Sequence, residues 1–398
     1  MKYIERKAYL DRLKGLKNTP DIKIITGIRR CGKSELMQAY MEFIRQSDLN
    51  ANIIFVDFFD LDFDDLKNYK ALHGYVNEKF IQGKNNYVFI DEVQLCSQFE
   101  LAINSLHNSM KYDIYITGSN AFLLSSDLTT LFTGRFIEIP VYPFSFKEFC
   151  LYYSDTADKN ELLDEYICKG GLAGSYVYQS EVDRAAYIRD VYNTIVKRDL
   201  VDKYNIRDLS PLAHLAEFLM DNISNLCSPD KICACLEANL YKTDIDMVNN
   251  YIKYLCNAYV FYNIKRYDIK GKRYLETSEK YYLNDLGVRF AVLGNKNSDY
   301  GRAYENIVAM ELIRRGYEVY VGKLYQKEVD FVAIKQGKKL YIQVSDNITQ
   351  EKTFLREVNP LLQIRDAYPK IILANTRHPE YQYEGIRVIN IADWLLDN

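Results

Sequence analysis

Residues 27–34 read Gly-Ile-Arg-Arg-Cys-Gly-Lys-Ser and fit the pattern G-x-x-x-x-G-K-[ST] without a departure. Gly27 and Gly32 allow the main chain to turn tightly and to point its amide groups inward around an anion. Lys33 supplies a positive charge for the outer phosphates, and the hydroxyl of Ser34 is placed to ligate Mg²⁺. The pattern predicts a site for ATP and Mg²⁺. Its residues are Gly27, Ile28, Arg29, Arg30, Cys31, Gly32, Lys33, Ser34 and Glu35.

The surroundings of this loop are those that a phosphate-binding loop requires. An apolar run, residues 22–27, precedes it, and a helix-patterned run, residues 34–46, follows it and adds the positive end of its dipole. The alternative is a chance glycine turn, which the strand–loop–helix order makes rarer. Arg29 and Arg30 are unusual inside such a loop: one of them could contact phosphate directly, or they could face solvent or an adjoining domain.

Two carboxylates end a second apolar run. Residues 87–90 are Tyr-Val-Phe-Ile, and Asp91 and Glu92 follow them. A buried strand here places Asp91 at its carboxyl edge, beside the phosphate loop of a neighbouring strand, where it could hold Mg²⁺ through water. Glu92 is then positioned to polarise an attacking water as a general base. An ordinary acidic turn is the alternative, but the loop upstream favours the catalytic interpretation.

Further candidates for the same site follow later strands. A run that ends in Thr117 and Gly118 continues with Ser119 and Asn120, whose polar side chains could hydrogen-bond the γ-phosphate or the attacking water. Turn chemistry alone would also explain Gly-Ser-Asn. Arg135 is a candidate transition-state arginine, acting within its own chain or across a subunit contact. A surface salt bridge would explain it nearly as well.

The elements that must position these residues belong to a chain of 398 residues, which suggests two to four domains. The chain is 48% hydrophobic and 26% charged, with a net charge of −3, which excludes a disordered chain and any global basic excess for nucleic acid. The eight cysteines and four histidines show no zinc or disulfide spacing. With no signal peptide and no membrane-length apolar run, the sequence predicts a cytoplasmic protein without membrane contact.

Apolar, β-branched runs alternate with helical patterns over the first part of the chain, as in a parallel sheet covered on both faces. The predicted fold class is α/β, with a P-loop NTPase sheet followed by a helical and winged-helix part and a small α/β domain. The expected boundaries are 1–150 for the ATPase domain, 151–205 for a helical segment, 206–285 for a winged helix-turn-helix and 286–398 for the last domain.

The winged-helix prediction comes from two helix patterns followed by a hairpin within residues 228–285. Its second helix carries Asp244 and Asp246, a poor surface for phosphates. Its hairpin is basic and could clamp a DNA backbone without reading bases. The residues expected to do so are Lys265, Arg266, Lys270, Lys272 and Arg273. An interdomain or protein-binding module is an equal alternative, so the predicted partners are ATP and either DNA or a protein.

Several segments together resemble a widespread group of prokaryotic AAA-type ATPases, the archaeal ATPase family. They are residues 27–34, 87–94, 116–124, 133–149 and 192–200. The resemblance runs along the whole chain and implies the additional-strand P-loop class, with the phosphate-loop strand central and the glutamate after Asp91 catalytic. Residues 143–146 and the pair Arg198-Asp199 match recurrent motifs of this group, and no role is carried over for them.

The resemblance also implies a C-terminal domain of restriction-endonuclease-like kind. Such nucleases hold Mg²⁺ with acids on a helix and two strands, beside a lysine. The matching positions here are Glu305, Asp330, Gln343 and Ser345. Serine in the lysine position lacks the charge that stabilises the transition state, a loss of about 10²–10³ in rate. We therefore expect a degenerate nuclease fold used for binding, unless Lys338 or Lys339 replaces the missing lysine.

Three functions follow in order of preference. The first is a Mg²⁺-dependent ATPase whose nucleotide state switches the posture of the winged-helix and nuclease-like domains. The second is a scaffold that binds nucleotide without hydrolysing it and assembles on DNA or a protein. The third is an ATP-dependent nuclease, which the serine at position 345 disfavours.

Overall fold

The computed structural model describes residues 3–118, 132, 134–153, 158–238, 241, 243–294 and 299–397. The chain forms two compact units. The first contains Met1–Pro143 together with Asn193–Asn205, and the second contains Phe144–Tyr192 together with Ile206–Asn398. The segment Asn193–Asn205 therefore packs with the first unit, although the chain on both sides of it belongs to the second.

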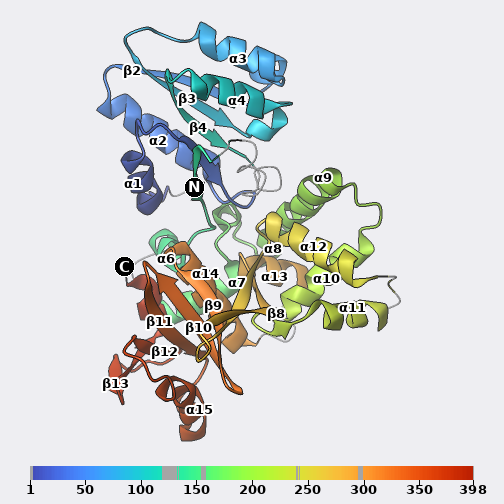
Figure 1. Ribbon diagram of the computed structural model, residues 1–398, viewed down its shortest axis with the longest axis vertical. Coiled ribbons are helices and arrows are strands. Elements are labelled where there is room, and N and C mark those ends of the chain that lie inside the picture. The colour runs from blue at the N-terminus through green and yellow to red at the C-terminus, as the bar shows by residue number, and fades with distance from the viewer. Residues whose placement is uncertain are drawn as a thin grey trace. The chain divides into compact units, whose positions relative to one another are not determined.

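The first unit is built on a five-stranded parallel sheet in the order β2-β3-β4-β1-β5. Its strands are β1 (Ile22–Thr26), β2 (Ala51–Asp57), β3 (Asn85–Asp91), β4 (Tyr112–Thr117) and β5 (Phe136–Pro140). Its main helices are α1 (Lys7–Gly15), α2 (Lys33–Ser47), α3 (Tyr69–Glu78) and α4 (Phe99–Asn108) (Figure 1). The predicted α/β parallel sheet is confirmed. The order differs from the expectation in one respect, because β4 is the central strand and β1 lies one place away from it.

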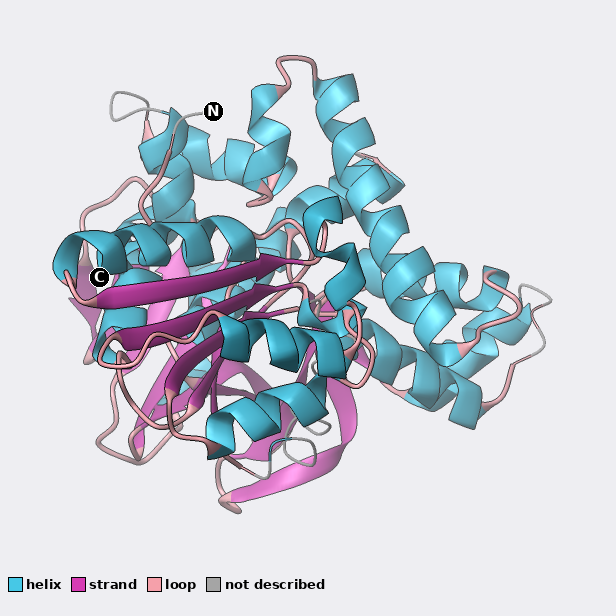
Figure 2. Ribbon diagram, turned by 90° about the horizontal axis from the view of Figure 1, so that it is seen from above, coloured by secondary structure: helices cyan, strands magenta, loops and turns pink. Residues whose placement is uncertain are grey.

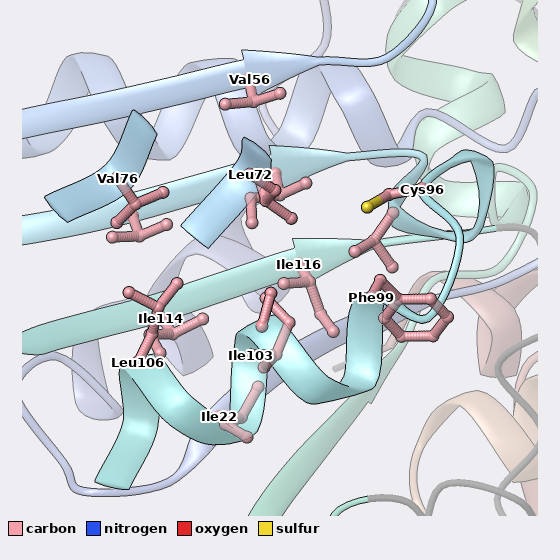
Figure 3. Close-up of a cluster of buried hydrophobic side chains, with 14 of the residues drawn as sticks. Ile22, Val56, Leu72, Val76, Cys96, Phe99, Ile103, Leu106, Ile114 and Ile116 are labelled. Carbon is pink, nitrogen blue, oxygen red and sulfur yellow. The ribbon is translucent and has the colours of Figure 1, made fainter. Parts of the chain in front are cut away.

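Apolar residues from α3 and α4 cover one face of this sheet. Leu72 and Val76 of α3 and Ile103 and Leu106 of α4 are almost fully buried against strand residues such as Ile116 (Figure 3). On α2, Tyr40 packs on Tyr115 of β4 with 5.2 Å between ring centroids. Helices on both faces explain why the strands read as continuous apolar runs, since both sides of each strand are buried.

The second unit contains a mixed nine-stranded sheet in the order β13-β14-β12-β11-β10-β9-β7-β8-β6. Figure 2 colours the helices of the chain cyan and its strands magenta. Its strands are β6 (Leu226–Cys227), β7 (Phe261–Asp268), β8 (Arg273–Leu283), β9 (Glu318–Leu324), β10 (Lys327–Lys335), β11 (Lys338–Ser345), β12 (Lys370–Ala374), β13 (Tyr381–Tyr383) and β14 (Ile386–Asn390). The hairpin β7–β8, predicted as the wing, pairs in parallel with β9 of the predicted nuclease-like domain.

Most of the remaining helices belong to this second unit. They are α6 (Phe146–Tyr153), α7 (Lys159–Lys169), α8 (Glu181–Thr194), α10 (Ser210–Asp221), α11 (Pro229–Ala238), α12 (Ile245–Asn257), α13 (Leu286–Leu293), α14 (Tyr300–Arg314), α15 (Glu351–Leu362) and α16 (Ile391–Leu396). Val358 and Leu361 of α15 are buried against the sheet residues Val332 and Tyr341. The predicted domain boundaries and the winged-helix and nuclease-like folds stay predictions. Within the described residues, no helix combines the length and the apolar character needed to cross a bilayer.

Candidate active site

The loop between β1 and α2 adopts a conformation that depends on its first glycine. Gly27 has φ 144°, and a Cβ atom on it would lie 2.1 Å from the carbonyl oxygen of Val141 and 2.9 Å from Sγ of Cys31. Gly32, at the N-cap of α2, has φ 95°. Because both angles favour glycine and no side chain fits at position 27, the loop can follow this path only with glycine there.

Lys33 lies folded over this loop. Its Nζ atom donates to the carbonyl oxygens of Gly27 at 3.1 Å and Ile28 at 3.2 Å, and the side chain is buried. Ser34 is half-buried and Glu35 is exposed in the first turn of α2. The ammonium group is therefore held against the main chain of the loop.

Arg6 is a residue of this site that the sequence did not indicate. Its buried guanidinium donates to the carbonyl oxygens of Cys31 at 3.0 Å and Tyr142 at 2.9 Å, so it ties the loop to the chain that follows β5. Burial raises the pKa of the Cys31 thiol, although Lys33 and Arg6 oppose the shift. Cys31 is therefore a packing residue. The contact between Arg6 and Cys31 could not be predicted, because no sequence motif links these two positions.

Thr117 connects the two predicted carboxylates. Its buried hydroxyl donates to Oδ1 of Asp91 and accepts from the main-chain nitrogen of Glu92 at 3.1 Å. The prediction that Asp91 ends a strand next to β1 is wrong: Asp91 ends β3, and β4 lies between β3 and β1. Thr117 ends this intervening strand, and its hydroxyl contacts both acidic residues.

Glu92 occupies a strained backbone position. Its φ is 54° and its ψ 48°, in the left-handed region that residues with side chains rarely adopt, and it is 7% exposed. Its Oε2 atom accepts a hydrogen bond from Nε2 of Gln94. Such strain persists where the surrounding structure fixes it, and it concentrates at functional sites. Gln94 was not predicted as a site residue, although it lies only two residues after Glu92, the predicted general base.

Arg29 does not extend into solvent. Its Nη2 atom lies 3.0 Å from Oδ1 of Asp199, a buried residue of the π-helical segment η4 (Ile195–Val201). Nε of Arg29 is buried, and the described part of the chain provides no hydrogen-bond partner for it. Arg30, in contrast, is exposed, with φ 67°.

The other predicted catalytic residues are not brought to this loop by the described structure. Arg135 lies where the sheet begins: its carbonyl oxygen accepts from the nitrogen of Ile22, the first residue of β1, and its exposed side chain donates to Asn108 at 2.7 Å. Its proposed action across a subunit contact stays a prediction. Ser119 and Asn120 lie outside the described residues.

Comparison with known proteins assigns the family. Residues 19–150 match the family model described as an AAA domain, and residues 160–299 match a model described as a domain of unknown function. An uncharacterized protein of Haemophilus influenzae is 37% identical over 99% of this chain and 98% of its own length. The chain belongs to the family of that protein.

A second relative, an uncharacterized protein of Methanocaldococcus jannaschii, is 28% identical over 94% of this chain and 85% of its own length. Among solved structures, the Walker-type ATPase of Pyrococcus abyssi is similar, with a TM-score of 0.49 and 16% identity over 73% of this chain and 96% of that chain.

The second predicted site, that of the nuclease-like pattern, lies in the second unit. The main-chain nitrogen of Asp330 donates to Oε1 of Gln343 at 3.1 Å, and its carboxylate accepts from the nitrogen of Val344 at 2.7 Å. Nε2 of Gln343 donates to Glu357 at 3.0 Å. Ser345 is buried and donates to the carbonyl oxygen of Asn347. The structure thus brings Asp330 and Gln343 together. Their assignment to a nuclease-like site stays a prediction.

A lysine does contact the predicted acid Glu305, but it comes from β8 and not from β11, the strand of Ser345. Nζ of Lys280 lies 2.8 Å from Oε1 of Glu305 and 2.8 Å from Oε1 of Glu328, and its side chain is 4% exposed. Lys339 instead donates to the hydroxyl of Tyr267, and Lys338 is exposed at the start of β11. The expected replacement lysines therefore do not contact the acids, while Lys280 does.

Burial and neighbouring charges both shift the pKa values of this cluster. Burial raises the pKa of Glu305 and, with the neighbouring Glu305 charge, raises the pKa of Asp330 well above its usual range. Burial works to lower the pKa of Lys280, but Glu305, Asp330 and Glu328 outweigh it and the pKa is raised. No group of three or more His, Cys, Asp or Glu that could hold a metal occurs in the described part of the chain.

Proposed function

We propose that this chain binds ATP with Mg²⁺ and hydrolyses it, and that the bound nucleotide acts on the segment Asn193–Asn205 through Arg29. The observation that carries the proposal is that one buried hydroxyl, that of Thr117, holds both the end of Asp91 and the backbone of Glu92. In this proposal Asp91 is the acid that orients the metal and Glu92 is the general base. Both lie at the carboxyl ends of the strands, the edge of the sheet where the phosphate loop also begins.

The residues present suit a magnesium ion. Ser34 and Asp91 offer oxygen ligands, which Mg²⁺ prefers, and this ion is usually held by one or two protein groups together with the phosphates of its nucleotide. When bound, Mg²⁺ neutralises charge that develops on the phosphates. Amides of the loop and Nζ of Lys33 would bind the same oxygens.

In the proposed reaction, Glu92 accepts a proton from a water molecule, and the water oxygen forms a bond to the γ-phosphorus. The bond between this phosphorus and the bridging oxygen to the β-phosphate breaks, giving ADP and phosphate. Gln94, which donates to Glu92, and Thr117 hold the base in place. A general base at this position contributes about 10²–10⁴ in rate.

The proposed coupling rests on the ion pair between Arg29 and Asp199. Arg29 lies inside the loop that surrounds the phosphates, so bound ATP adds negative charge beside a guanidinium that Asp199 holds. The segment that carries Asp199 continues at both ends into the second unit. A change in this ion pair would therefore alter a segment that is covalently joined to the second unit.

The proposal is tested with Lys33→Ala, which removes the ammonium group above the loop. We expect phosphate release to fall to background, whereas Lys84→Ala, at an exposed site outside the loop, leaves it unchanged. Wild-type protein should gain about 2.7 kcal/mol of stability at a hundredfold excess of Mg-ATP over Kd. Unchanged hydrolysis in the Lys33 variant would refute the assignment.

Glu92→Gln separates this proposal from a scaffold that binds nucleotide without hydrolysis. We expect the variant to keep the thermal shift with Mg-ATP but to lose turnover. A wild-type protein that binds Mg-ATP and releases no phosphate at any concentration would instead favour the scaffold.

A further inference from the structure

Two turns of the second unit lie side by side, although the sequence places them in different predicted domains. Strand β7 runs parallel to β9, with Arg266 opposite Val321 and Asp268 opposite Lys323. The nitrogen of Ile269 donates to the carbonyl oxygen of Lys323 at 2.9 Å. Because the paired strands are parallel, the turn after β7 and the turn after β9 are at the same end of the sheet.

Contact between the tips of these turns confirms their proximity. Nζ of Lys270, from the first turn, lies 4.6 Å from the ring centroid of Tyr325, from the second. The two turns and the strand ends beside them carry basic and tyrosine side chains that are exposed or half-buried, and we call this set the lysine–tyrosine ledge. Its residues are Lys270, Lys272, Arg273, Tyr274, Tyr325 and Lys327.

The ledge carries positive charge that nearby acids do not neutralise. Asp268 accepts from the nitrogen of Gly271 and lies 3.7 Å from Nε of Arg273, while Glu328 is engaged by the buried Lys280. Within the residues that the structure describes, the three ledge lysines, Lys270, Lys272 and Lys327, have no ion pair. A local positive surface of this kind attracts a polyanion even though the whole chain has a net charge of −3.

The ledge also exposes two aromatic rings. Tyr274 and Tyr325 are each 58% exposed. The ring of Tyr274 packs at 5.0 Å from that of Tyr320 and 5.6 Å from that of Tyr267, so its position is fixed before anything binds. Exposed rings beside lysines are the arrangement on which successive bases of a single strand stack while the lysines contact phosphates. A duplex offers only its backbone to such rings, because its bases are already stacked.

We propose that the lysine–tyrosine ledge binds single-stranded nucleic acid. The lysines contact phosphates, and Tyr274 and Tyr325 stack on bases. Of the five hairpin residues predicted to contact DNA, Lys270, Lys272 and Arg273 belong to this ledge, whereas Lys265 and Arg266 lie further back on β7. The ledge is a separate site from the phosphate loop, so its binding does not depend on ATP hydrolysis.

The test is fluorescence anisotropy of the full chain with labelled 20-mers of dT, of U and of a mixed-sequence duplex, between 50 and 200 mM salt. The charge variant is Lys270→Ala with Lys327→Ala, and its matched control is Lys338→Ala with Lys352→Ala, two exposed lysines of the same unit. We expect tighter binding of the single strands than of the duplex. The charge variant should bind about tenfold more weakly and lower the log–log salt slope by about 1.4, since each phosphate contact contributes about 0.7.

Stacking is tested separately by Tyr325→Asn, because asparagine tolerates the left-handed backbone of this position, where φ is 55°. We expect binding to weaken about tenfold with an unchanged salt slope. The dT and U arms identify which nucleic acid is preferred, and Lys33→Ala should bind as wild type does. The proposal is overturned by tighter binding of the duplex, by equal effects of the charge variant and its control, or by binding to phosphatidylserine vesicles without affinity for any oligonucleotide.

Discussion

Asp199 lies 3.0 Å from Arg29, so a carboxylate of a π-helical segment is paired with a guanidinium of the phosphate loop. Both side chains are largely buried, with exposed fractions of 6% and 16%. π-Helical turns are rare and occur frequently at functional sites. The pair joins two positions far apart in the sequence, and it is the contact through which nucleotide in the loop would act on the segment Asn193–Asn205.

The first prediction concerns this pair. Asp199→Ala leaves the Arg29 charge buried without its partner, and we expect the first unit to lose about 3 kcal/mol of stability. The double variant with Arg29→Ala should recover much of the loss, and saturating Mg-ATP should reduce it, because the phosphates then neutralise Arg29. Hydrogen exchange of amides in β1 and β4 measures the stability of this unit in each variant.

The exposed pair between Glu42 and Arg45 of α2 serves as the control, since both side chains are more than half exposed. Its double-mutant cycle should show no measurable coupling. A loss in Asp199→Ala that Mg-ATP leaves unaltered would contradict the proposed competition between phosphate and carboxylate.

The second prediction concerns the positioning hydroxyl of Thr117. Thr117→Val keeps the shape of the side chain but removes its donor to Asp91 and its acceptor for the nitrogen of Glu92. We expect turnover to fall about 10²-fold, because a small displacement of catalytic groups has an effect of that order. The Mg²⁺ concentration at half-maximal rate should rise, since Asp91 loses its orientation.

Steady-state phosphate release across a magnesium titration measures both changes. Thr117→Ser retains the hydroxyl and should restore most of the activity. Full activity in the valine variant would show that Thr117 only packs in the core.

Much of the first unit was predictable from the sequence. Strands such as Tyr112–Thr117 are continuous apolar runs because helices cover both faces, and the glycines of the loop have a fixed spacing. The order of the strands in the sheet was harder to predict from the sequence. Periodicity shows that a strand is buried but not which strand lies beside it, so β3 was expected next to β1 and Thr117 was not recognised as the link between Asp91 and Glu92.

The other site contacts that the sequence did not predict join residues that are distant in sequence. Arg6, Asp199 and Lys280 carry no local pattern that relates them to Cys31, Arg29 or Glu305. A replacement lysine was expected at Lys338 or Lys339, on the same strand as Ser345, because only neighbours along a strand can be inferred from the sequence. The lysine that contacts the acids comes from β8, which only the tertiary structure places beside them.

The third prediction concerns this lysine. Lys280→Met leaves Glu305 and Glu328 without their shared cation, and we expect a loss of about 3–5 kcal/mol at pH 8. The pKa of Glu305 and the pKa of Asp330 are already raised by burial, and removing the lysine raises them further. Groups with a raised folded pKa lose their contribution to stability as the pH rises through that pKa, so the loss should be smaller at pH 5.

Trp394 is the single tryptophan of the chain and lies buried in α16, so its fluorescence reports unfolding of the second unit. Lys280→Met with Glu305→Gln should be more stable than Lys280→Met alone at pH 8. An equal loss at both pH values would contradict the electrostatic explanation and favour one based on packing.

The last prediction concerns Asp285, the N-cap of α13. Its carboxylate accepts from the nitrogens of Gly171 at 2.7 Å and Gly287 at 2.8 Å, and Gly170 approaches so closely that a Cβ atom there would lie 1.9 Å from Oδ1. Burial raises the pKa of Asp285 to about 6, although the bonds from the amides of Gly171, Gly287 and Leu172 oppose the shift.

The folded unit therefore holds a proton on Asp285 between pH 4 and 6 that the unfolded chain has already released. Its contribution to stability is complete below the ordinary pKa and is lost as the pH rises toward 6, with a slope of at most about 1.4 kcal/mol per pH unit. Asp285→Asn keeps an acceptor for the cap but does not titrate. We expect the difference in stability between the variant and wild type, followed by Trp394 fluorescence in urea, to change across this window and to level off above pH 7. A difference that stays constant from pH 4 to 7 would mean that the carboxylate of Asp285 ionises as readily as one in solvent, and that its amide contacts balance its burial.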